Sequence, residues 1–86
     1  MYQITFKKKA SKELSQLPSI VLPKVVSEID NLAEDPRPVG SKKLKGSDEN
    51  MWRIRIGDYR VIYVIDDGIR IINIRKVGHR KDVYKK

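Results

Sequence analysis

The sequence predicts an α+β fold, in the order β-α-α-β-β-β, with two helices packed on one face of a twisted antiparallel sheet. Apolar residues recur with a helical period in the first half of the chain and with a period of two after residue 50. Two Gly/Asp turn signals divide that second half into three strands. With 86 residues and a hydrophobic content of 40%, residues 1–86 are predicted to form a single domain.

The chain is predicted to begin with a strand and a helix. Residues 2–6 alternate apolar and polar side chains, which is typical of a short strand. Ala10, Leu14 and Leu17 then follow at positions i, i+4 and i+7. This spacing predicts a helix that Pro18 ends, because the residue before a proline disfavours helical backbone angles.

A second helix is predicted after Pro18, with Ser19 as its N-cap. Pro23 is compatible with this helix only in or near the first turn, where its missing N–H is not needed. Residues 36–50 are rich in Pro, Gly and small polar side chains and are predicted to form a long loop. The apolar stripe of the helix consists of Leu22, Val25, Val26, Ile29, Leu32 and Ala33.

The last three strands are predicted at residues 51–56, 59–66 and 69–77, with residues 78–86 as a polar tail. The Gly-Asp pair at 57–58 suits a type II′ hairpin turn, and the Asp-Gly pair at 67–68 suits a type I′ turn. Because these turns fix the register, they also decide which side chains share a face of the sheet.

Four arginines are predicted to converge on one face of these strands. Arg60 lies opposite Arg55 on one neighbouring strand and opposite Arg75 on the other, with Arg53 close by. Directly opposed like charges weaken a sheet by roughly 0.2–1 kcal/mol per pair. No carboxylate occupies the strand positions of this face, so we predict that it binds anionic groups such as phosphates. The other face is the predicted core side, with Trp52, Ile54, Ile56, Tyr59, Val61, Tyr63, Ile65, Ile72 and Ile74.

Composition narrows the classes of function further. The net charge of +8 favours a polyanionic partner, with nucleic acid as the first candidate and an acidic protein segment as the second. The chain has no Cys, which excludes disulfides, Cys-ligated zinc and thiol catalysis, and its one His excludes a zinc site of several imidazoles. We find neither a signal peptide nor a membrane-spanning apolar stretch, and expect a cytoplasmic protein with no membrane partner.

Three motifs carry a resemblance to a known family. They are Trp52-Arg53-Ile54-Arg55-Ile56, Tyr59-Arg60-Val61-Ile62-Tyr63, and Val77-Gly78-His79-Arg80 followed by Asp82-Val83-Tyr84. In this order and spacing, the chain resembles the RelE branch of the RelE/ParE toxin superfamily over nearly its whole length. The resemblance implies a RelE-like domain that is the toxin of a type II toxin–antitoxin pair. Such toxins are ribosome-dependent endoribonucleases (mRNA interferases), which cleave mRNA in the A site without a metal or other cofactor.

The resemblance also implies partners. The first is a RelB-like antitoxin, which we expect to be acidic because of the +8 charge of this chain. The second is the ribosome with mRNA in its A site. Operator DNA is expected to bind only the toxin–antitoxin complex.

The family's functional residues can be carried over to three positions. Arg60 matches its central-strand arginine, Arg80 the arginine after the last strand, and Tyr84 the C-terminal tyrosine. Three other positions depart from the family pattern, in which lysines are found: these are Arg53, Arg55 and His79.

RNA cleavage without a metal requires in-line placement of the 2′-OH, its deprotonation, stabilisation of the charged phosphorane and protonation of the 5′-oxygen. We predict that the scissile phosphate is bound by Arg55, Arg60 and Arg80, and that neighbouring phosphates are bound by Lys43, Lys45, Arg53 and Arg75. Tyr84 is the candidate base, or a stacking surface for a neighbouring nucleobase. His79 is the candidate proton donor, since imidazole titrates near neutral pH.

Two other functions remain open at this stage. One is a ParE-like gyrase inhibitor, which would use the same fold to bind a protein. The other is a catalytically inactive module that binds an antitoxin or acts as a corepressor.

Overall fold

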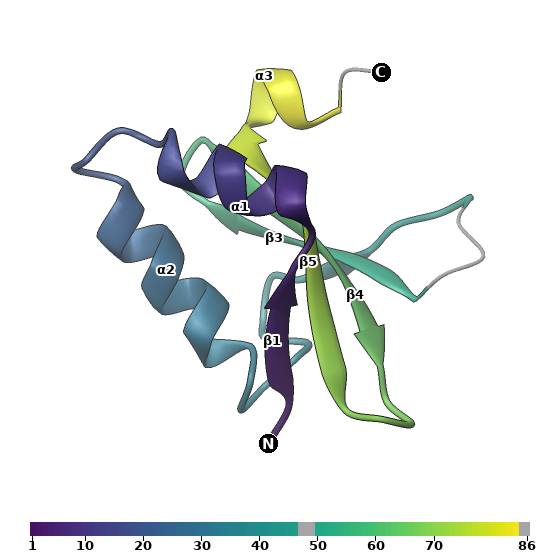
Figure 1. Ribbon diagram of the computed structural model, residues 1–86. Helices are drawn as coiled ribbons and strands as arrows, with labels where there is room; N and C mark the ends of the chain where they lie inside the picture. Colours follow the sequence, from purple (N-terminus) through teal and green to yellow (C-terminus); the bar gives the residue numbers. More distant parts are fainter. Residues whose placement is uncertain (47–49, 85–86) are drawn as a thin grey trace.

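The structure is a computed structural model that describes residues 1–46 and 50–84. A five-stranded sheet has the strand order β1-β5-β4-β3-β2 and is accompanied by three helices (Figure 1). No helix among the described residues is long and apolar enough to cross a membrane. The elements are β1 (Gln3–Phe6), α1 (Lys8–Ser15), α2 (Leu22–Asn31), β2 (Lys42–Lys43), β3 (Met51–Ile56), β4 (Tyr59–Asp66), β5 (Ile71–His79) and α3 (Arg80–Val83).

The predicted α+β class is confirmed, but the sheet is mixed rather than antiparallel throughout. β1 pairs with β5 in parallel, whereas the other three pairings are antiparallel. A parallel partner is reached only after a long crossover, so no local turn signal in the sequence reports it. β1 thereby covers the edge of β5 that faces away from β4.

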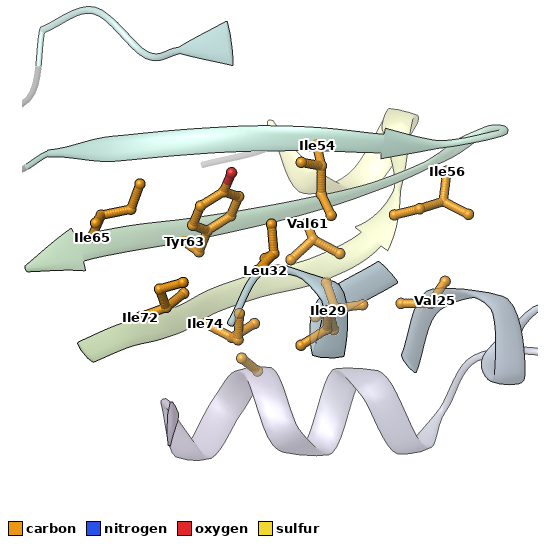
Figure 2. Close-up of a cluster of buried hydrophobic side chains, with 12 residues drawn as sticks. Val25, Ile29, Leu32, Ile54, Ile56, Val61, Tyr63, Ile65, Ile72 and Ile74 are labelled. Atoms are coloured by element: carbon orange, nitrogen blue, oxygen red, sulfur yellow. The ribbon is translucent and has the colours of Figure 1, made fainter. Parts of the chain in front are cut away.

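One face of the sheet is buried beneath α1 and α2 (Figure 2). Ala10 of α1 and Val25 and Ile29 of α2 are fully buried, and each lies on the stripe that the helical period predicts. Burying a side chain of valine or isoleucine size contributes roughly 1.5–3 kcal/mol, so this face dominates the stability of the domain. The strands contribute Ile54, Ile56, Val61, Tyr63, Ile65, Ile72, Ile74 and Val77.

The start of α2 differs from the prediction. The N-cap is Val21 rather than Ser19, because the amides of Val21 and Leu22 both donate to the carbonyl of Pro18 and form a separate turn first. Pro23 does lie in the first turn of the helix, as expected. Val26, which was placed on the apolar stripe, is exposed.

The β3–β4 hairpin confirms the predicted register. Arg55 lies opposite Arg60, and Trp52 lies opposite Tyr63. Gly57 has a φ of 59°, the left-handed value that the first central residue of a type II′ turn requires.

The β4–β5 turn is where the prediction fails. Instead of a two-residue turn at Asp67-Gly68, residues 67–70 form the connection and β5 begins at Ile71. The Asp66 Oδ1 atom accepts hydrogen bonds from the amides of Gly68 (3.0 Å) and Ile69 (3.2 Å), which favours the longer turn. Arg70 then adopts a left-handed φ of 57°.

A β-bulge shifts the same pairing by one further residue. Tyr63 lies opposite Ile74, but Ile62 lies opposite Lys76, so that Arg75 is the additional residue on β5. Strict alternation from Ile74 would turn Lys76 into the core, whereas the bulge places the apolar Val77 there instead.

The longer turn and the bulge together remove one predicted like-charge pair. Arg60 lies opposite Gly78 rather than opposite Arg75. The last residue of β1, Phe6, pairs with Ile74, directly before the bulge. Beyond the end of β1, the Val77 amide donates a hydrogen bond to the Glu13 carboxylate of α1 at 3.2 Å.

Two segments that were predicted to be irregular contain regular structure. β5 continues to His79, and α3 follows directly from its end (Figure 1), so residues 78–84 are not a simple polar tail. Within the predicted loop, β2 pairs with β3, and the Leu44 amide donates to the Met51 carbonyl at 2.9 Å. Ser47, Asp48 and Glu49 of that loop, and the end of the tail at 85–86, lie outside the described residues.

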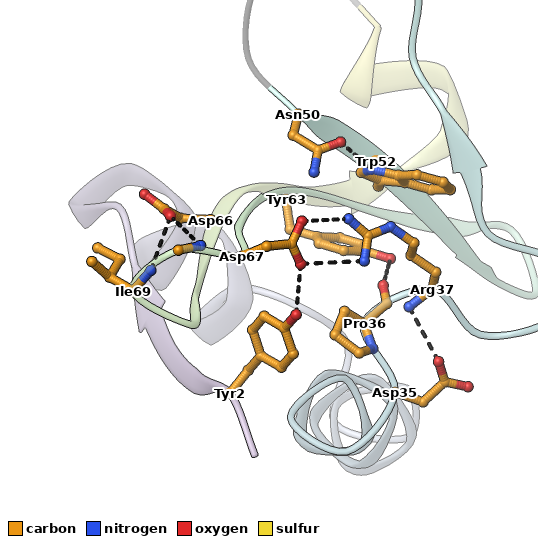
Figure 3. A network of polar contacts seen from close by, with 11 residues as sticks. Tyr2, Asp35, Pro36, Arg37, Asn50, Trp52, Tyr63, Asp66, Asp67 and Ile69 are labelled. Carbon is orange, nitrogen blue, oxygen red and sulfur yellow. Dashed lines mark hydrogen bonds and ion pairs between the residues drawn. The ribbon is translucent and has the colours of Figure 1, made fainter.

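A polar network fastens the loop after α2 to the β4–β5 turn (Figure 3). The two terminal nitrogens of Arg37 bind the two carboxylate oxygens of Asp67 at 2.9 and 3.4 Å, and the Tyr2 hydroxyl donates to Asp67 at 2.6 Å. These contacts, with Arg37 foremost, lower the pKa of Asp67. The Arg37 guanidinium also lies 5.2 Å from the centroid of the Trp52 ring, and the Tyr63 hydroxyl donates to the Pro36 carbonyl at 2.7 Å.

Tyr63→Phe provides a test of this packing. Burial raises the pKa of Tyr63 to about 12, whereas an unfolded chain ionises tyrosine near 10. The unfolded state therefore binds fewer protons between these values, and wild-type stability should fall as pH rises from about 10 to about 12. Tyr63→Phe should cost about 1 kcal/mol at neutral pH through the lost hydrogen bond.

The measurement is the urea-unfolding free energy of both proteins as a function of pH. The difference between them should shrink as pH rises above 10, because only the wild type carries the buried hydroxyl. A constant difference across that range would contradict the buried, hydrogen-bonded placement.

Candidate nucleic-acid interface

The sheet face opposite α1 and α2 carries a dense set of cations. Because Ile54 and Val61 point into the core, alternation directs Arg53, Arg55 and Arg60 to the opposite, open face. Arg53, Ile62 and Lys76 form one row across the three strands, and Arg55, Arg60 and Gly78 form the next. We call this surface the basic face.

Lys76, which sequence analysis did not single out, is thus part of the basic face. The sequence does indicate that Lys76 faces this side: Ile74 and Val77 are three residues apart, whereas two core residues of a regular strand are two apart. Both are buried on the core side, and only a bulge between them reconciles that spacing with a strand.

An open groove of about 610 Å³ lies on the basic face. Residues of β3, β4, β5 and α3 line it together with Lys7, Lys45 and Tyr84 from the connecting segments, which brings together parts of the chain that are far apart in sequence. Its lining combines ammonium and guanidinium groups with apolar side chains and one exposed tyrosine ring. This combination suits a single-stranded nucleotide, whose phosphates bind cations and whose base stacks on an aromatic or apolar surface. The lining residues are Lys7, Lys45, Met51, Ile62, Arg75, Lys76, Val83 and Tyr84.

The Arg75 side chain is held by a chain of hydrogen bonds that starts on β1. Thr5 Oγ1 accepts from Asn73 Nδ2 at 2.9 Å, and Asn73 Oδ1 accepts from Arg75 Nε at 2.6 Å. Each donor and acceptor in the chain fixes the orientation of the next, so the guanidinium is oriented before any ligand arrives.

α3 closes one side of the groove. Val83 is buried, with 4% of its surface exposed, and the Lys76 ammonium donates to the Val83 carbonyl at 3.3 Å. Tyr84 follows as the C-cap residue and remains 55% exposed at the groove.

The two arginines that the resemblance identified lie at the β3–β4 turn. Arg60 donates through Nη1 to the carbonyls of Gly57 and Tyr59, both at 2.9 Å. The Arg80 amide donates to the Asp58 carbonyl at 2.8 Å, and its Nε lies 3.7 Å from the Asp58 carboxylate. The Arg80–Asp58 ion pair is exposed, so it contributes little stability and leaves the guanidinium accessible.

His79 lies apart from this groove. It pairs with Tyr59 across the sheet, and the two rings meet edge to face with centroids 5.5 Å apart. The two rings line a pocket of about 300 Å³ together with Gln16 and Leu17 at the end of α1. The imidazole is therefore on the helix side of the sheet, away from the residues that line the groove.

The lysines of the 36–50 loop divide between the two faces. Lys43 lies opposite Trp52, on the row of the core side, whereas its neighbour Lys42 lies opposite Arg53, on the row of the basic face. Lys45 lines the groove. Only the β2–β3 pairing distinguishes these lysines, and a two-residue strand leaves no periodicity in the sequence to detect.

Lys7 is a second groove residue that sequence analysis missed. Its amide donates to the Ile74 carbonyl at 2.9 Å, which places it beside the bulge. That position follows from the parallel β1–β5 pairing, for which the sequence carries no local signal.

No group of three or more His, Cys, Asp or Glu side chains suited to a metal ion occurs within residues 1–46 and 50–84.

Comparison with known proteins points to one superfamily. The family profile described as the ParE toxin of the type II toxin–antitoxin system parDE matches residues 4–84. A protein of Methanocaldococcus jannaschii that bears the name toxin RelE1 is 40% identical, over 98% of this chain and 96% of its own. Toxin RelG of Mycobacterium tuberculosis is 34% identical, over 99% and 98% of the two chains.

Solved structures agree with these sequence matches. RelE in the archaeal RelE–RelB complex of Pyrococcus horikoshii is similar with a TM-score of 0.81 and 30% identity, over 94% of this chain and 97% of that one. The isolated RelE toxin of E. coli is similar with a TM-score of 0.79 and 26% identity, over 92% and 84% of the two chains.

Binding to a short single-stranded oligoribonucleotide should depend on salt in proportion to the phosphates neutralised. The slope of log K against log[salt] is about −0.7 per phosphate for single strands, so Arg53→Gln should make the slope shallower by about 0.7. Lys24→Gln is the matched control, because Lys24 is exposed on α2 in the helix layer and should leave the slope unchanged. A flat salt dependence of the wild type would contradict the assignment of the basic face.

Proposed function

We propose that this chain, which belongs to the RelE branch of the RelE/ParE superfamily of type II toxins, is a ribosome-dependent endoribonuclease that cleaves mRNA in the A site. The observation that carries the proposal is the groove on the basic face, where Tyr84 and three lysines meet beside the arginines of the sheet. The A site would supply a strand held in the extended geometry that this groove accommodates.

The proposed reaction is an intramolecular transfer at phosphorus. The 2′-oxygen attacks the adjacent phosphorus, so that the P–O2′ bond forms as the P–O5′ bond breaks, which leaves a 2′,3′-cyclic phosphate. The 2′-OH proton passes to a base on the protein, and the leaving 5′-oxygen takes a proton from an acid. The extra negative charge that develops on the phosphorane is what the cations stabilise.

Arginines are suited to that stabilisation. A guanidinium grips two phosphate oxygens with parallel hydrogen bonds and stays charged throughout the reaction. In the proposal, Arg60 and Arg80 bind the scissile phosphate, with Arg55 in the same row as Arg60. Neighbouring phosphates are bound by Lys45, Arg53 and Arg75. Lys43, which was also expected to bind a phosphate, would have to reach it from the core-side row of the sheet.

In the proposal, proton transfer is carried out by residues that line the groove. Tyr84 is the proposed base, because its ring is exposed in the groove lining, beside the cations that would bind phosphates. Lysine side chains can donate a proton to the 5′-oxygen, and Lys7 and Lys76 both line the groove. His79, the donor expected from the sequence, would have to act from the helix side of the sheet.

The antitoxin is the second part of the proposal. The similar structures include RelE–RelB complexes from Pyrococcus horikoshii and E. coli. We propose a RelB-like antitoxin for this chain as well, with acidic residues that meet the basic face and block the groove. Operator DNA would be bound by the toxin–antitoxin complex alone.

Primer extension on a defined mRNA in a purified translation system tests the nuclease. Wild-type protein should produce discrete cuts in the A-site codon, and Arg80→Ala should abolish them. The Arg80 side chain is exposed and pairs with the exposed Asp58, so its loss should not unfold the domain. Lys24→Ala, a change on the exposed surface of α2, serves as the matched control and should cleave normally. Intact mRNA with the wild type, together with gyrase-dependent DNA breaks, would establish the ParE-like function instead.

Tyr84→Phe separates acid–base chemistry from stacking. If the hydroxyl is the base, its removal should lower the cleavage rate by roughly 10²–10⁴-fold while the ring stays in place. The rate is measured in single-turnover assays on programmed ribosomes. A much smaller loss in Tyr84→Phe, with a large loss in Tyr84→Ala, would assign the ring to stacking and leave the base to another residue.

A further inference from the structure

We infer that His79 is a positioning residue, whose imidazole caps α3 and so fixes Arg80 and Tyr84 at the two ends of that helix. The inference deepens the proposed function and rests on it for one of its two readouts. It assigns to His79 a role through the backbone of α3 rather than in proton transfer to the substrate.

The capping geometry is specific. His79 has φ −66° and ψ 145°, the extended conformation of an N-cap residue, and Arg80 begins the helix. Its Nδ1 atom accepts a hydrogen bond from the amide of Lys81, the second helical residue, at 3.1 Å. An amide N–H can only donate, so Nδ1 must be the unprotonated nitrogen and the ring proton lies on Nε2. A doubly protonated imidazole has no acceptor and could not form this cap.

The ring is oriented from a second direction by the sheet. Tyr59 lies opposite His79 on β4, and its ring meets the imidazole at an interplanar angle of 81°. This edge contact holds the imidazole plane while Nδ1 faces the first turn of α3. A lysine, the residue that the RelE resemblance leads one to expect at this position, has three donors and no acceptor, so it could not replace the cap.

α3 depends on such contacts because it is short. Four residues are far below the length at which an isolated helix is stable, so hydrogen bonds at its ends and packing against the sheet must hold it. Besides the cap, these contacts include the Arg80 amide bond to the Asp58 carbonyl, the Lys76 ammonium bond to the Val83 carbonyl, and the burial of Val83. Loss of the cap frays the N-terminal end of α3, which carries Arg80. In so short a helix it also loosens the C-terminal end, which carries Tyr84.

The test compares His79→Ala with His79→Asn. Alanine removes the cap, whereas the asparagine Oδ1 is among the best N-cap acceptors but cannot act as an acid near neutral pH. Loss of an N-cap should shift the equilibrium between the formed and frayed helix by about fivefold in His79→Ala. Hydrogen exchange at the Lys81 amide, measured by NMR on the free chain, should speed up accordingly and return to the wild-type rate in His79→Asn.

Cleavage of mRNA on the ribosome is the second readout. His79→Ala should lose up to about fivefold in rate, in step with the loss of α3, and His79→Asn should recover it. Protection of the Tyr63 amide in the centre of the sheet should be the same in all three proteins, which shows that each is folded.

Three results would overturn the inference. Unchanged Lys81 exchange in His79→Ala would show that the imidazole does not cap the helix. Faster exchange with full cleavage activity would show that the cap does not position Arg80 and Tyr84. A loss of roughly 10²–10⁴-fold in His79→Asn despite restored exchange would make His79 a proton donor. If the wild type does not cleave mRNA, the proposed function fails, while the exchange measurement still decides whether His79 caps α3.

Discussion

The pairing of β4 with β5, and the bulge within it, is the constraint on which the rest of the site depends. Ile72, Ile74 and Val77 must all reach the core, and their spacing permits this only if one residue is added between Ile74 and Val77. That addition turns both Arg75 and Lys76 to the groove. The bulge that brings Val77 into the core therefore also places two cations side by side on the opposite face.

One-sided burial explains how the sheet tolerates so much positive charge. The main hydrophobic core lies on the face covered by α1 and α2, so the opposite face can carry cations at little cost in core burial. The buried side chains of Ile62 and Val83 interrupt it and attach α3 to the sheet. Stability and function thus occupy opposite faces of the same strands.

The sequence was sufficient wherever the information was local. Helical and strand periods located α1, β3 and β4, and Gly57 fixed the β3–β4 turn, so Arg53, Arg55 and Arg60 were placed on the correct face. Contacts between residues far apart in the chain could not be predicted from the sequence. The side chain of Asp66 selected a longer turn, the parallel β1–β5 pairing brought in Lys7, and the short α3 depended on contacts across the sheet. The predicted pairing of Arg60 with Arg75 is therefore wrong, and His79 belongs to the end of β5 rather than to a polar tail.

The central claim is that RNA binds to the face of the sheet opposite α1 and α2. Its most direct test is a two-dimensional ¹H–¹⁵N NMR titration of the free chain with a short single-stranded oligoribonucleotide at low salt. We predict that shift changes will cluster at the amides of the groove, those of Lys7, Arg75, Lys76 and Tyr84, and will leave the exposed surface of α2 unchanged. Shift changes that instead cluster on α1 and α2 would contradict the account, and would make the basic face a surface for some other partner.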